Sequence, residues 1–396
     1  MALQVFTIFW IVFQVAIALI LLFPVISYTW WLLLSKTQKI KSQPILAPDY
    51  GIIVTAYKYA GNLPNVITSL LNQDYPHYMI YVVADNCGDD VIFPEHDKLV
   101  ILKPKPALGN QLKSHFLAIN NFKRPHNIVT IIDSDNLTHP AYLSGLNKWF
   151  NRGFKAVQGV RAAKNTNTEY ASLDAVNEMY YLFYDRKILF GIGSSCMLSG
   201  SGMAFTTALY KECLQSSNSS GAGFDKILQK EILLRNHRIA FAENAIVYDE
   251  KTASADQLVK QRARWINTWF RYSKFGFQLM LKGIINFNLN QWLFGFVLVR
   301  PPLFMLLILC LAITVINFFI SPYFALAWVF ALLLFTLGFF IALYNSGAGK
   351  NLYKALWHIP KFIFLQIVSL FKAKKANEIS VSTQHQIHEE IDTLIK

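Results

Sequence analysis

The stretch Ile128-Val129-Thr130-Ile131-Ile132-Asp133-Ser134-Asp135-Asn136 decides the fold class of this chain. Its first five residues are β-branched and mostly apolar, which predicts a fully buried strand of a parallel sheet. The run then passes directly into two carboxylates, Asp133 and Asp135, one residue apart. Open α/β sheets bind ligands at the carboxyl ends of their strands, and such a carboxylate pair suits a hard divalent cation, Mg or Mn. The same Asp-x-Asp-Asn run is also ordinary turn chemistry, in which the side chains bond their own backbone.

Short β-rich runs alternate with helical stretches around this strand, from Tyr50 to about Val247. The predicted strands and helices of the first half are Gly51–Ala56, Asn62–Asn72, Met79–Ala84, Leu99–Leu102, Gly109–Asn121 and Ile128–Asp133. This alternation predicts an α/β fold with a mostly parallel sheet covered by helices. Polar side chains then follow three strands at one edge of the sheet, namely Thr55, Asp85 and the Asp133/Asp135 pair.

The second half of this region offers two more candidate site segments. A helix rich in Tyr and Phe is predicted over Tyr170–Phe190, and the small-residue stretch Gly191–Gly202 follows it. That stretch is either a flexible loop or a segment whose backbone approaches a ligand closely. Another helix is predicted to begin near Asp225, after Gly221–Gly223. Because a carboxylate at a helix start is often the N-cap, Asp225 is either a cap or a functional acid.

An amphipathic helix is predicted over Asp256–Phe275. The spacing i, i+3, i+4 places Gln261, Arg264 and Trp265 on one face of it. The helix is either an interfacial helix with snorkelling arginines or a cationic and aromatic lid over a phosphate leaving group.

Two blocks of the chain, residues 1–35 and 301–349, carry no charged side chain. A membrane span needs ~20 apolar residues, so these blocks predict transmembrane helices over residues 5–34, 302–320 and 323–344, the last two as a hairpin. The Arg300-Pro301-Pro302 run would end the preceding apolar segment, Asn290–Val299, and places Arg300 at the cytoplasmic interface. Leu352–Phe371, which Pro360 interrupts, is expected to lie at the interface rather than to span.

The chain is basic, with 37 Lys and Arg against 24 Asp and Glu and a net charge of +13. Such a balance invites a nucleic-acid interpretation, yet no recognisable nucleic-acid module is present. The basic residues instead flank the apolar blocks, at Lys36, Lys39, Lys41, Lys350, Lys354, Lys361, Lys372, Lys374 and Lys375. This placement follows the positive-inside rule and fits attraction to anionic lipids. We therefore expect membrane lipids, and no nucleic acid, as partners.

These motifs together resemble those of the membrane-bound family 2 glycosyltransferases, in particular the polysaccharide synthase and ceramide glucosyltransferase-like branches. Asp133-Ser134-Asp135 matches the family's DxD motif, and Gln261, Arg264 and Trp265 match its Gln-x-x-Arg-Trp motif completely. Asp225 falls where the family has the aspartate of Thr-Glu-Asp, although Gly223-Phe224-Asp225 keeps only that aspartate. Arg238-Ile239 and Val247-Tyr248-Asp249-Glu250 support this register.

The resemblance implies a GT-A domain and a role for each matched residue. Asp135, supported by Asp133, would bind a divalent cation that bridges the donor diphosphate, and Asp225 would be the catalytic base. Arg264, with Gln261 and Trp265, would contact the diphosphate and the acceptor. The donor nucleotide would be held by Thr55, Ala56, Asp85 and Lys113, although Asp85-Asn86-Cys87-Gly88 departs from the family's usual Asp-Gly-Ser run.

The expected function is inverting transfer of a sugar from a nucleotide-sugar donor to a lipid-linked or polysaccharide acceptor. A bacterial inner membrane location with a cytoplasmic catalytic domain is expected on the resemblance. The expected parts are the first helix (1–35), the GT-A domain (45–255), the interfacial helices (256–290), the transmembrane hairpin (291–345) and an interfacial helix with a basic tail (346–396). Two alternatives stay open: a processive polysaccharide synthase that translocates its product, and a catalytically inactive sugar-nucleotide sensor or scaffold.

Overall fold

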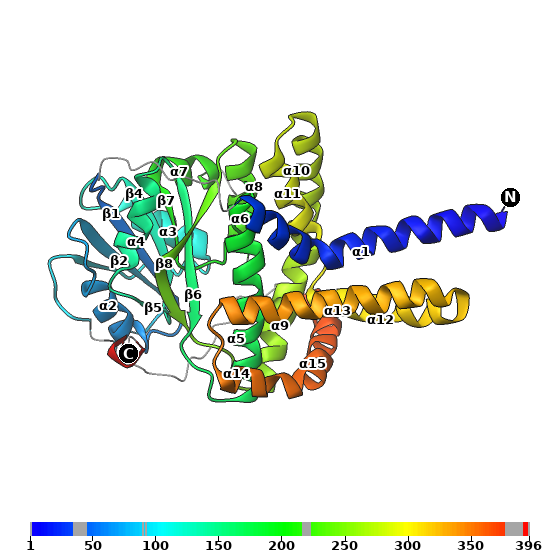
Figure 1. Ribbon diagram of the computed structural model, residues 1–396. Helices are drawn as coiled ribbons and strands as arrows, with labels where there is room; N and C mark the ends of the chain where they lie inside the picture. Colours follow the sequence, from blue (N-terminus) through cyan, green and yellow to red (C-terminus); the bar gives the residue numbers. More distant parts are fainter. Residues whose placement is uncertain are drawn as a thin grey trace.

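The computed structural model describes residues 2–34, 46–88, 91, 93–215, 223–376 and 391–394. A sheet domain lies at one end, a group of helices lies in the middle, and three long helices project from the other end (Figure 1). The predicted basic flank at residues 36–41, residue Gly221 and most of the polar tail after Gln384 lie outside the described residues.

The sheet has eight strands in the order β3-β2-β1-β4-β7-β6-β8-β5. Their bounds are β1 Tyr50–Tyr57, β2 Tyr78–Asp85, β3 Leu99–Leu102, β4 Ile128–Asp133, β5 Leu137–Thr138, β6 Ala156–Ala163, β7 Met203–Thr206 and β8 Ile239–Asp249. Strands β3, β2, β1 and β4 run parallel, as do β6 and β8, whereas β7 lies antiparallel between β4 and β6. This sheet confirms the predicted α/β class and adds an antiparallel insertion that periodicity did not indicate.

Strand β4 is buried along almost its whole length, because helices cover both faces of the sheet. Helices α2 (Leu63–Leu71) and α4 (Tyr142–Phe150) pack on one face. Helices α3 (Gln111–Asn120), α7 (Thr207–Leu214) and α8 (Phe224–Leu234) pack on the other, in a core that continues into the membrane-side helices. The register places Thr55 of β1 opposite Asp133 of β4, and Tyr57 opposite Asp85 of β2. The carboxyl ends of these three strands therefore share one edge, as predicted.

A long central helix joins the sheet domain to the projecting helices. It begins as α5 (Glu169–Tyr181), passes through a π-helical segment η1 (Leu182–Ile188) and ends as α6 (Leu189–Gly191). Asp185 in η1 accepts bonds from Arg300 Nη2 on both carboxylate oxygens, at 2.6 Å each. The Tyr184 hydroxyl donates to the Gly338 carbonyl at 2.8 Å. Arg300 therefore forms an ion pair with Asp185 that the sequence did not indicate.

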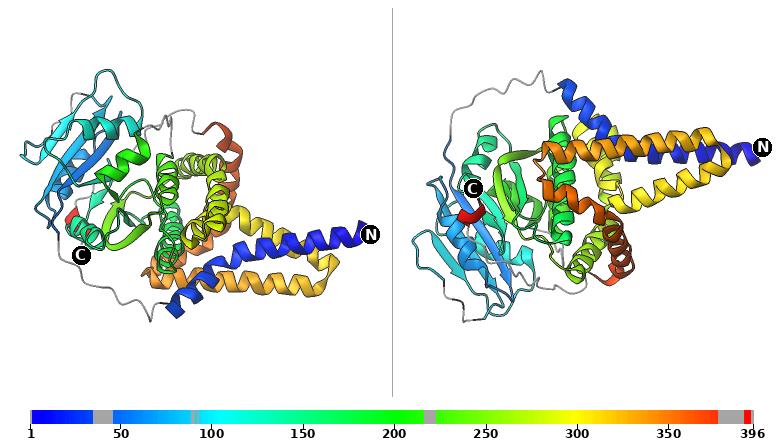
Figure 2. Two further views of the ribbon diagram at one scale, coloured as in Figure 1. Left: turned by 90° about the horizontal axis from the view of Figure 1, so that it is seen from above. Right: turned by 60° about the horizontal axis from the view of Figure 1, so that its bottom comes forward.

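Four helices lie around the central helix, between the sheet domain and the projecting helices (Figures 1 and 2). They are α9 (Ala255–Tyr272), α10 (Lys274–Ile285), α11 (Leu289–Val299) and α15 (Ile359–Lys372), and α15 packs along α9. The shorter elements near the C-terminus are α14 (Lys350–Ala355), η2 (Leu356–His358), η3 (Ala373–Lys375) and α16 (Ile391–Leu394). The predicted helix Asp256–Phe275 corresponds to α9, which ends at Tyr272. The predicted helix Leu352–Phe371 is interrupted by η2 just before α15, whose second residue is Pro360.

Three helices of the described chain are long and apolar enough to cross a membrane: α1 (Ala2–Leu34), α12 (Leu303–Ile320) and α13 (Pro322–Asn345). They project side by side (Figures 1 and 2). Gln14 of α1 lies buried among them and accepts hydrogen bonds from Asn317 Nδ2 and, at 2.7 Å, from Trp328 Nε1. Such bonds hold helices together where the apolar surroundings offer no other partner.

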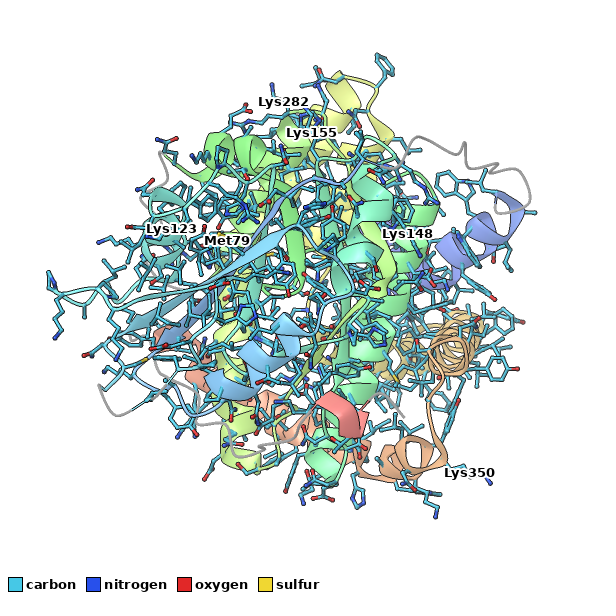
Figure 3. The ribbon with its side chains drawn as sticks, turned by 90° about the vertical axis from the view of Figure 1, so that its left-hand side faces the viewer. Met79, Lys123, Lys148, Lys155, Lys282 and Lys350 are labelled. Carbon is cyan, nitrogen blue, oxygen red and sulfur yellow. The ribbon has the colours of Figure 1, made fainter. Side chains whose placement is uncertain are left out.

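Seen from the opposite end of the molecule, Lys123, Lys148 and Lys155 lie apart from one another around the sheet domain (Figure 3).

Candidate active site

A polar cavity of about 230 Å³ lies at the carboxyl ends of the strands. Thr55 from β1 and Gln261 from α9 face it, together with the run Asp133–Asn136. The rest of its wall is Arg161, Asp249, Glu250, Lys251, Thr252 and Gln257. Asp133 and Asp135 reach this cavity because β4 ends at Asp133 and the turn that follows places Asp135 beside β8, with which β5 pairs. The structure thus brings Thr55, Asp133, Asp135 and Gln261 together.

The two carboxylates of the DxD motif are held by separate contacts. The Asp133 backbone N–H donates to Ser201 Oγ at 3.1 Å, and Gln111 Nε2 donates to Asp133 Oδ1 at 3.3 Å. Asp135 is only 8% exposed, and its carbonyl accepts from Lys164 Nζ at 2.8 Å. Ser201 of the small-residue stretch before β7 therefore contacts the end of β4.

Several residues of this cavity were not identified as site residues from the sequence, among them Arg161, Asp249 and Lys251. Arg161 of β6 pairs with Asp249 of β8 and donates to the Ser199 carbonyl at 2.8 Å, while Lys251 Nζ lies 2.9 Å from Asp249. Burial alone would lower the pKa of the Arg161 guanidinium, but the carboxylates of Asp249, Glu178 and Asp133 raise it above its usual range. In the sequence, the Val247–Glu250 run drew attention to Asp249. Nothing in the sequence around Arg161, within its strand, indicated that it would pair with Asp249.

The polar cavity fits a divalent cation that takes part of its coordination from a ligand. Asp133 and Asp135 supply carboxylate oxygens, and no group of three or more His, Cys, Asp or Glu side chains that could hold a metal is found in the described part of the chain. Mg²⁺ is usually bound in this way, by one or two carboxylates together with water and substrate phosphates. Two carboxylates alone would leave the rest of an ion's coordination to water or to a ligand.

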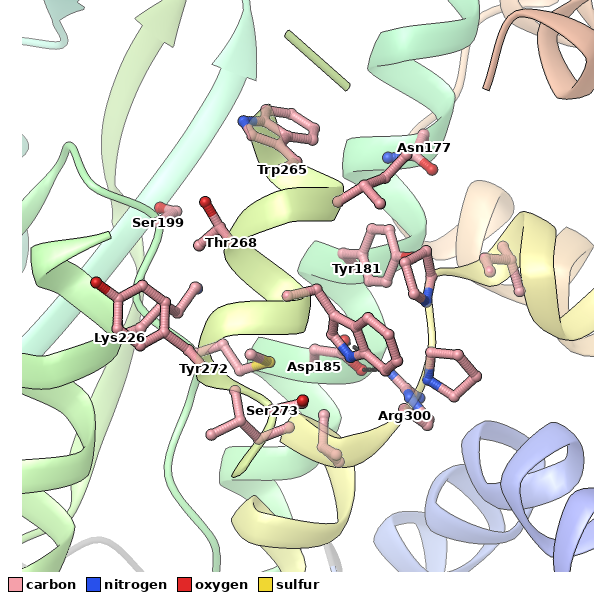
Figure 4. A pocket seen from close by; sticks show the side chains of 18 of the residues that line it. Asn177, Tyr181, Asp185, Ser199, Lys226, Trp265, Thr268, Tyr272, Ser273 and Arg300 are labelled. Carbon is pink, nitrogen blue, oxygen red and sulfur yellow. Dashed lines mark hydrogen bonds and ion pairs between the residues drawn. The ribbon is translucent and has the colours of Figure 1, made fainter. Parts of the chain in front are cut away.

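A second, larger cavity of about 440 Å³ lies behind the first, on the side of the projecting helices. We call it the membrane-side cavity. Figure 4 shows Trp265, Thr268 and Tyr272 projecting from α9, with Tyr181, Asp185 and Arg300 farther along the wall. Residues of α1, α8, α11 and α12 complete it, among them Asp225, Leu21, Leu298 and Phe304.

The two cavities adjoin at Arg161, which lines both. Gln111 faces the membrane-side cavity and donates to Asp133 of the polar cavity. The Asp133 carboxylate also acts on Arg264: burial lowers the pKa of the Arg264 guanidinium, and Asp133 opposes that shift. A molecule in one cavity can therefore reach groups that line the other.

Asp225 is the second residue of α8 and is not its N-cap. The N-cap is Gly223, at φ 100°, where a Cβ would come within 2.5 Å of the Tyr272 ring. The Asp225 side chain is 14% exposed, lines the membrane-side cavity and lies 3.1 Å from Lys226 Nζ. The helix start therefore presents this carboxylate to the cavity and does not use it as a cap.

The Gln-x-x-Arg-Trp residues of α9 divide between the cavities. Gln261 lines the polar cavity, while Arg264 and Trp265 line the membrane-side cavity. Trp265 is 41% exposed, and the Arg262 guanidinium lies 4.5 Å from its ring centroid. Among the described residues, the Arg264 guanidinium forms no ion pair, unlike its neighbour Arg262, which pairs with Asp174. Arg264 is therefore available to form an ion pair with an anion bound where the two cavities adjoin.

Three predicted donor residues do not line either cavity. The Asp85 carboxylate is buried and accepts from the backbone N–H groups of Leu108 and Gly109, at 2.8 and 2.7 Å. Ala56 is buried within β1, and Lys113 is exposed on the first turn of α3. In this structure Asp85 holds the loop that leads into α3.

Comparison with known proteins agrees with this architecture. Residues 48–268, more than half of the chain, match the family described as "Glycosyltransferase like family 2". The mannosyltransferase PcManGT from Pyrobaculum calidifontis, solved in complex with GDP-Man and Mn²⁺, has a similar fold with a TM-score of 0.55 and 15% identity, covering 90% of this chain and 98% of that one. A structure of TarS 1–349 from S. aureus covers 64% of this chain and 90% of its own, at 13% identity and a TM-score of only 0.35.

No curated protein sequence matches the chain. The family match nevertheless spans the sheet domain and α9 as far as residue 268, which includes both cavities' motif residues. The chain therefore belongs to glycosyltransferase family 2 and is a glycosyltransferase of the GT-A fold.

Proposed function

We propose that this enzyme transfers a sugar, with inversion, from a nucleotide-sugar donor to a membrane-borne acceptor, either a lipid or a lipid-linked glycan. The observation that carries the proposal is the junction of the two cavities, with Asp133 and Asp135 on one side and Asp225 on the other. Donor and acceptor could then enter from different sides and meet near Arg161. The domain assignment follows: residues 45–255 bind both the nucleotide-sugar and the acceptor, residues 256–290 form the interfacial helices, and residues 291–345 form the transmembrane hairpin.

The polar cavity suits the donor's diphosphate. Charge develops on the phosphate oxygens as the sugar bond breaks, and a cation shared by Asp133, Asp135 and the diphosphate would neutralise it without proton transfer. Arg264, buried and without an ion pair among the described residues, would add a charge-assisted hydrogen bond from the other side. The PcManGT complex with GDP-Man and Mn²⁺ supports both the donor class and the ion.

Asp225 is the proposed general base. An acceptor hydroxyl in the membrane-side cavity would give its proton to the Asp225 carboxylate while its oxygen bonds to the anomeric carbon. The bond from that carbon to the diphosphate breaks at the same time, and the nucleoside diphosphate leaves. Because attack and departure occur on opposite faces of the sugar, a single displacement inverts the anomeric centre.

The membrane-side cavity favours an acceptor that arrives through the membrane. Leu21 of α1 and Phe304 of α12 lie in its wall, and both helices are long and apolar enough to span a bilayer. The lysine-rich segment after residue 349 follows the hairpin, which by the positive-inside rule places the sheet domain in the cytoplasm. We assign the enzyme to the bacterial inner membrane on the family resemblance.

The test is a donor panel with the purified full-length protein in lipid nanodiscs. UDP-, GDP- and dTDP-sugars are incubated with Mn²⁺ and a lipid extract, and nucleoside diphosphate release and labelled lipid product are measured. One donor should give cation-dependent transfer. Release from none of them would contradict the proposal and favour an inactive sensor, and long polymeric products would favour a processive synthase.

A further inference from the structure

Lys251 is a buried cation in the wall of the polar cavity. It lies two residues after the end of β8, and only 3% of its surface is exposed. One side chain holds its backbone from both sides: the Lys251 N–H donates to Asn165 Oδ1 at 2.8 Å, and Asn165 Nδ2 donates to the Lys251 carbonyl at 3.2 Å. The place of this lysine beside the cavity is therefore fixed before a ligand binds.

The Lys251 ammonium donates no hydrogen bond to any described residue. Its Nζ lies 2.9 Å from Asp249 Oδ1, yet that oxygen is buried and accepts no hydrogen bond within the described chain. The contact is therefore an ion pair without hydrogen-bond geometry. An ammonium carries three N–H donors, and buried donors are normally satisfied. The donors of Lys251 therefore indicate a ligand that is rich in acceptor oxygens.

Asp249 does not depend on Lys251 for its neutralisation. Its other oxygen, Oδ2, accepts a hydrogen bond from Arg161 Nη2, and Arg161 Nη1 is anchored on the Ser199 carbonyl at 2.8 Å. Two cations thus share one carboxylate. Lys251, on its flexible stem, can therefore contact an anion while Arg161 keeps Asp249 compensated. In a buried pair of one cation and one carboxylate, the same movement would leave a charge uncompensated.

The balance of charge in the polar cavity favours such a contact. Its wall holds four carboxylates and two cations, namely Asp133, Asp135, Asp249, Glu250, Arg161 and Lys251. A divalent cation would bring this set to neutrality, and the donor then adds negative charge on both of its phosphates. As the sugar leaves, the phosphate oxygen that was bonded to it becomes anionic as well. A cation close to that phosphate therefore stabilises the departing group more than the intact donor.

We infer that Lys251 is a further catalytic residue, which donates hydrogen bonds from Nζ to the phosphate next to the sugar and stabilises the charge that develops there. It acts as a fixed positive charge and transfers no proton. Arg264 would contact the same diphosphate from the boundary of the two cavities. This inference rests on the proposed function, because it adds a residue to the diphosphate site of the same reaction.

The first test measures binding and requires no turnover. The full-length protein in nanodiscs is titrated by calorimetry, in the presence of Mn²⁺, with UDP, GDP and dTDP and with the corresponding monophosphates. In Lys251→Met the preference for a diphosphate over its monophosphate should fall by roughly 10–100-fold, the size of one charge-assisted contact. The affinity for the monophosphate should stay that of the wild type. The matched control is Lys260→Met, at an exposed lysine of α9 that lines neither cavity.

The second test separates a contact with the leaving group from a structural role. Asp249 keeps its bond to Arg161 in Lys251→Met, so the melting temperature should not fall. With the donor found by the panel, kcat should fall more than the donor KM rises, because the contact strengthens as the sugar bond breaks. Lys251→Arg keeps a cation at this position and should retain most of the diphosphate preference. It also replaces Lys251→Met if that variant does not fold.

The inference and the proposed function fail in different ways. Transfer by the wild type together with an unchanged diphosphate preference in Lys251→Met would remove Lys251 from the site and leave the proposed function intact. An equal loss of monophosphate and diphosphate affinity in Lys251→Met, or complete loss of the preference in Lys251→Arg, would also overturn the inference. A wild type that turns over no donor contradicts the proposed function, while the diphosphate preference still decides on Lys251. A wild type that binds none of the nucleotides contradicts both.

Discussion

The two cavities that meet at Arg161 differ in the residues and the elements that form their walls. The polar cavity is formed mainly by the turns that follow strands, and its wall is almost entirely polar or charged. The membrane-side cavity is formed mainly by helices. Within the described residues its cations other than Arg264 are paired with carboxylates, and apolar side chains cover its far end. The difference shows that a polar cavity and a partly apolar cavity adjoin at a single residue. Substitutions on either side should therefore change different kinetic constants.

The largest expected effect is on the membrane-side cavity, at Asp225. Asp225→Asn keeps the size of the side chain but cannot take up the acceptor proton, so kcat should fall by about 10²–10⁴-fold. Nucleotide binding, measured by calorimetry, should stay near that of the wild type. Asp256→Asn, an exposed carboxylate at the start of α9, is the control. Substantial activity in Asp225→Asn would rule out its role as the base.

The next effect is on the polar cavity, at Asp135. Asp135→Ala removes a carboxylate from the proposed cation site. Mn²⁺-dependent binding of the nucleotide should therefore weaken by roughly 10–100-fold, which corresponds to the loss of one or two charge-assisted interactions. The readout is a nucleotide titration at several Mn²⁺ concentrations. Asp97→Ala, an exposed residue before β3, should leave the titration unchanged. If Asp135→Ala behaves like this control, Asp135 does not bind the cation.

The stability of the protein should depend on pH through His115, which packs next to the start of α8. His115 is fully buried, lies 2.7 Å from the Tyr210 hydroxyl through Nδ1, and packs against Phe224, the residue before Asp225. Burial lowers the pKa of His115 to about 3. In the unfolded chain His115 takes up a proton as the pH falls below about 6.5, whereas in the folded protein it stays neutral down to about pH 3. The free energy of unfolding therefore decreases as the pH falls from about 6.5 towards 3.

At pH 5 this loss should reach about 2 kcal/mol relative to neutral pH. It can be measured as the pH dependence of unfolding in detergent micelles. His115→Phe should flatten the dependence between pH 7 and 5, whereas His77→Phe, at an exposed position, should not. An identical slope in wild type and His115→Phe would show that His115 is not the residue responsible.

The smallest effect should come from the boundary between the cavities. Arg264→Lys keeps the positive charge but loses the planar fork that can bind two oxygens at once, so kcat/KM should fall about 3–10-fold. Arg271→Lys on the exposed side of α9 is the matched control. A drop of equal size in both variants would mean that the effect comes from the helix and not from a diphosphate contact.

The sequence predicted the elements whose signal is local. Strand β4 has the predicted bounds, and the spans differ from prediction by a few residues at their ends, because β-branched runs and long apolar blocks determine these elements by themselves. The spacing of Gln261, Arg264 and Trp265 likewise placed all three at the cavities.

The parts that were missed depend on long-range pairing. Strand β7 has four residues, and only its neighbours β4 and β6 determine that it lies antiparallel between them. Arg161 gains its role from Asp249, 88 residues away, and Arg300 from Asp185, 115 residues away. A local pattern can single out one member of such a pair but cannot indicate the residue with which it pairs, because that residue lies far away in the sequence.

Gln14 gives the first helix a structural role that a plain anchor would not have. Its side-chain oxygen accepts hydrogen bonds from Asn317 and Trp328. Leu21, about two turns farther along the same helix, forms part of the wall of the membrane-side cavity. Exchanging residues 2–34 for an unrelated leader of equal length would strand an amide and an indole N–H inside hydrocarbon. The N-terminal helix is therefore an integral part of the enzyme, and chimeras that exchange it should lose the packing of α1 against α12 and α13.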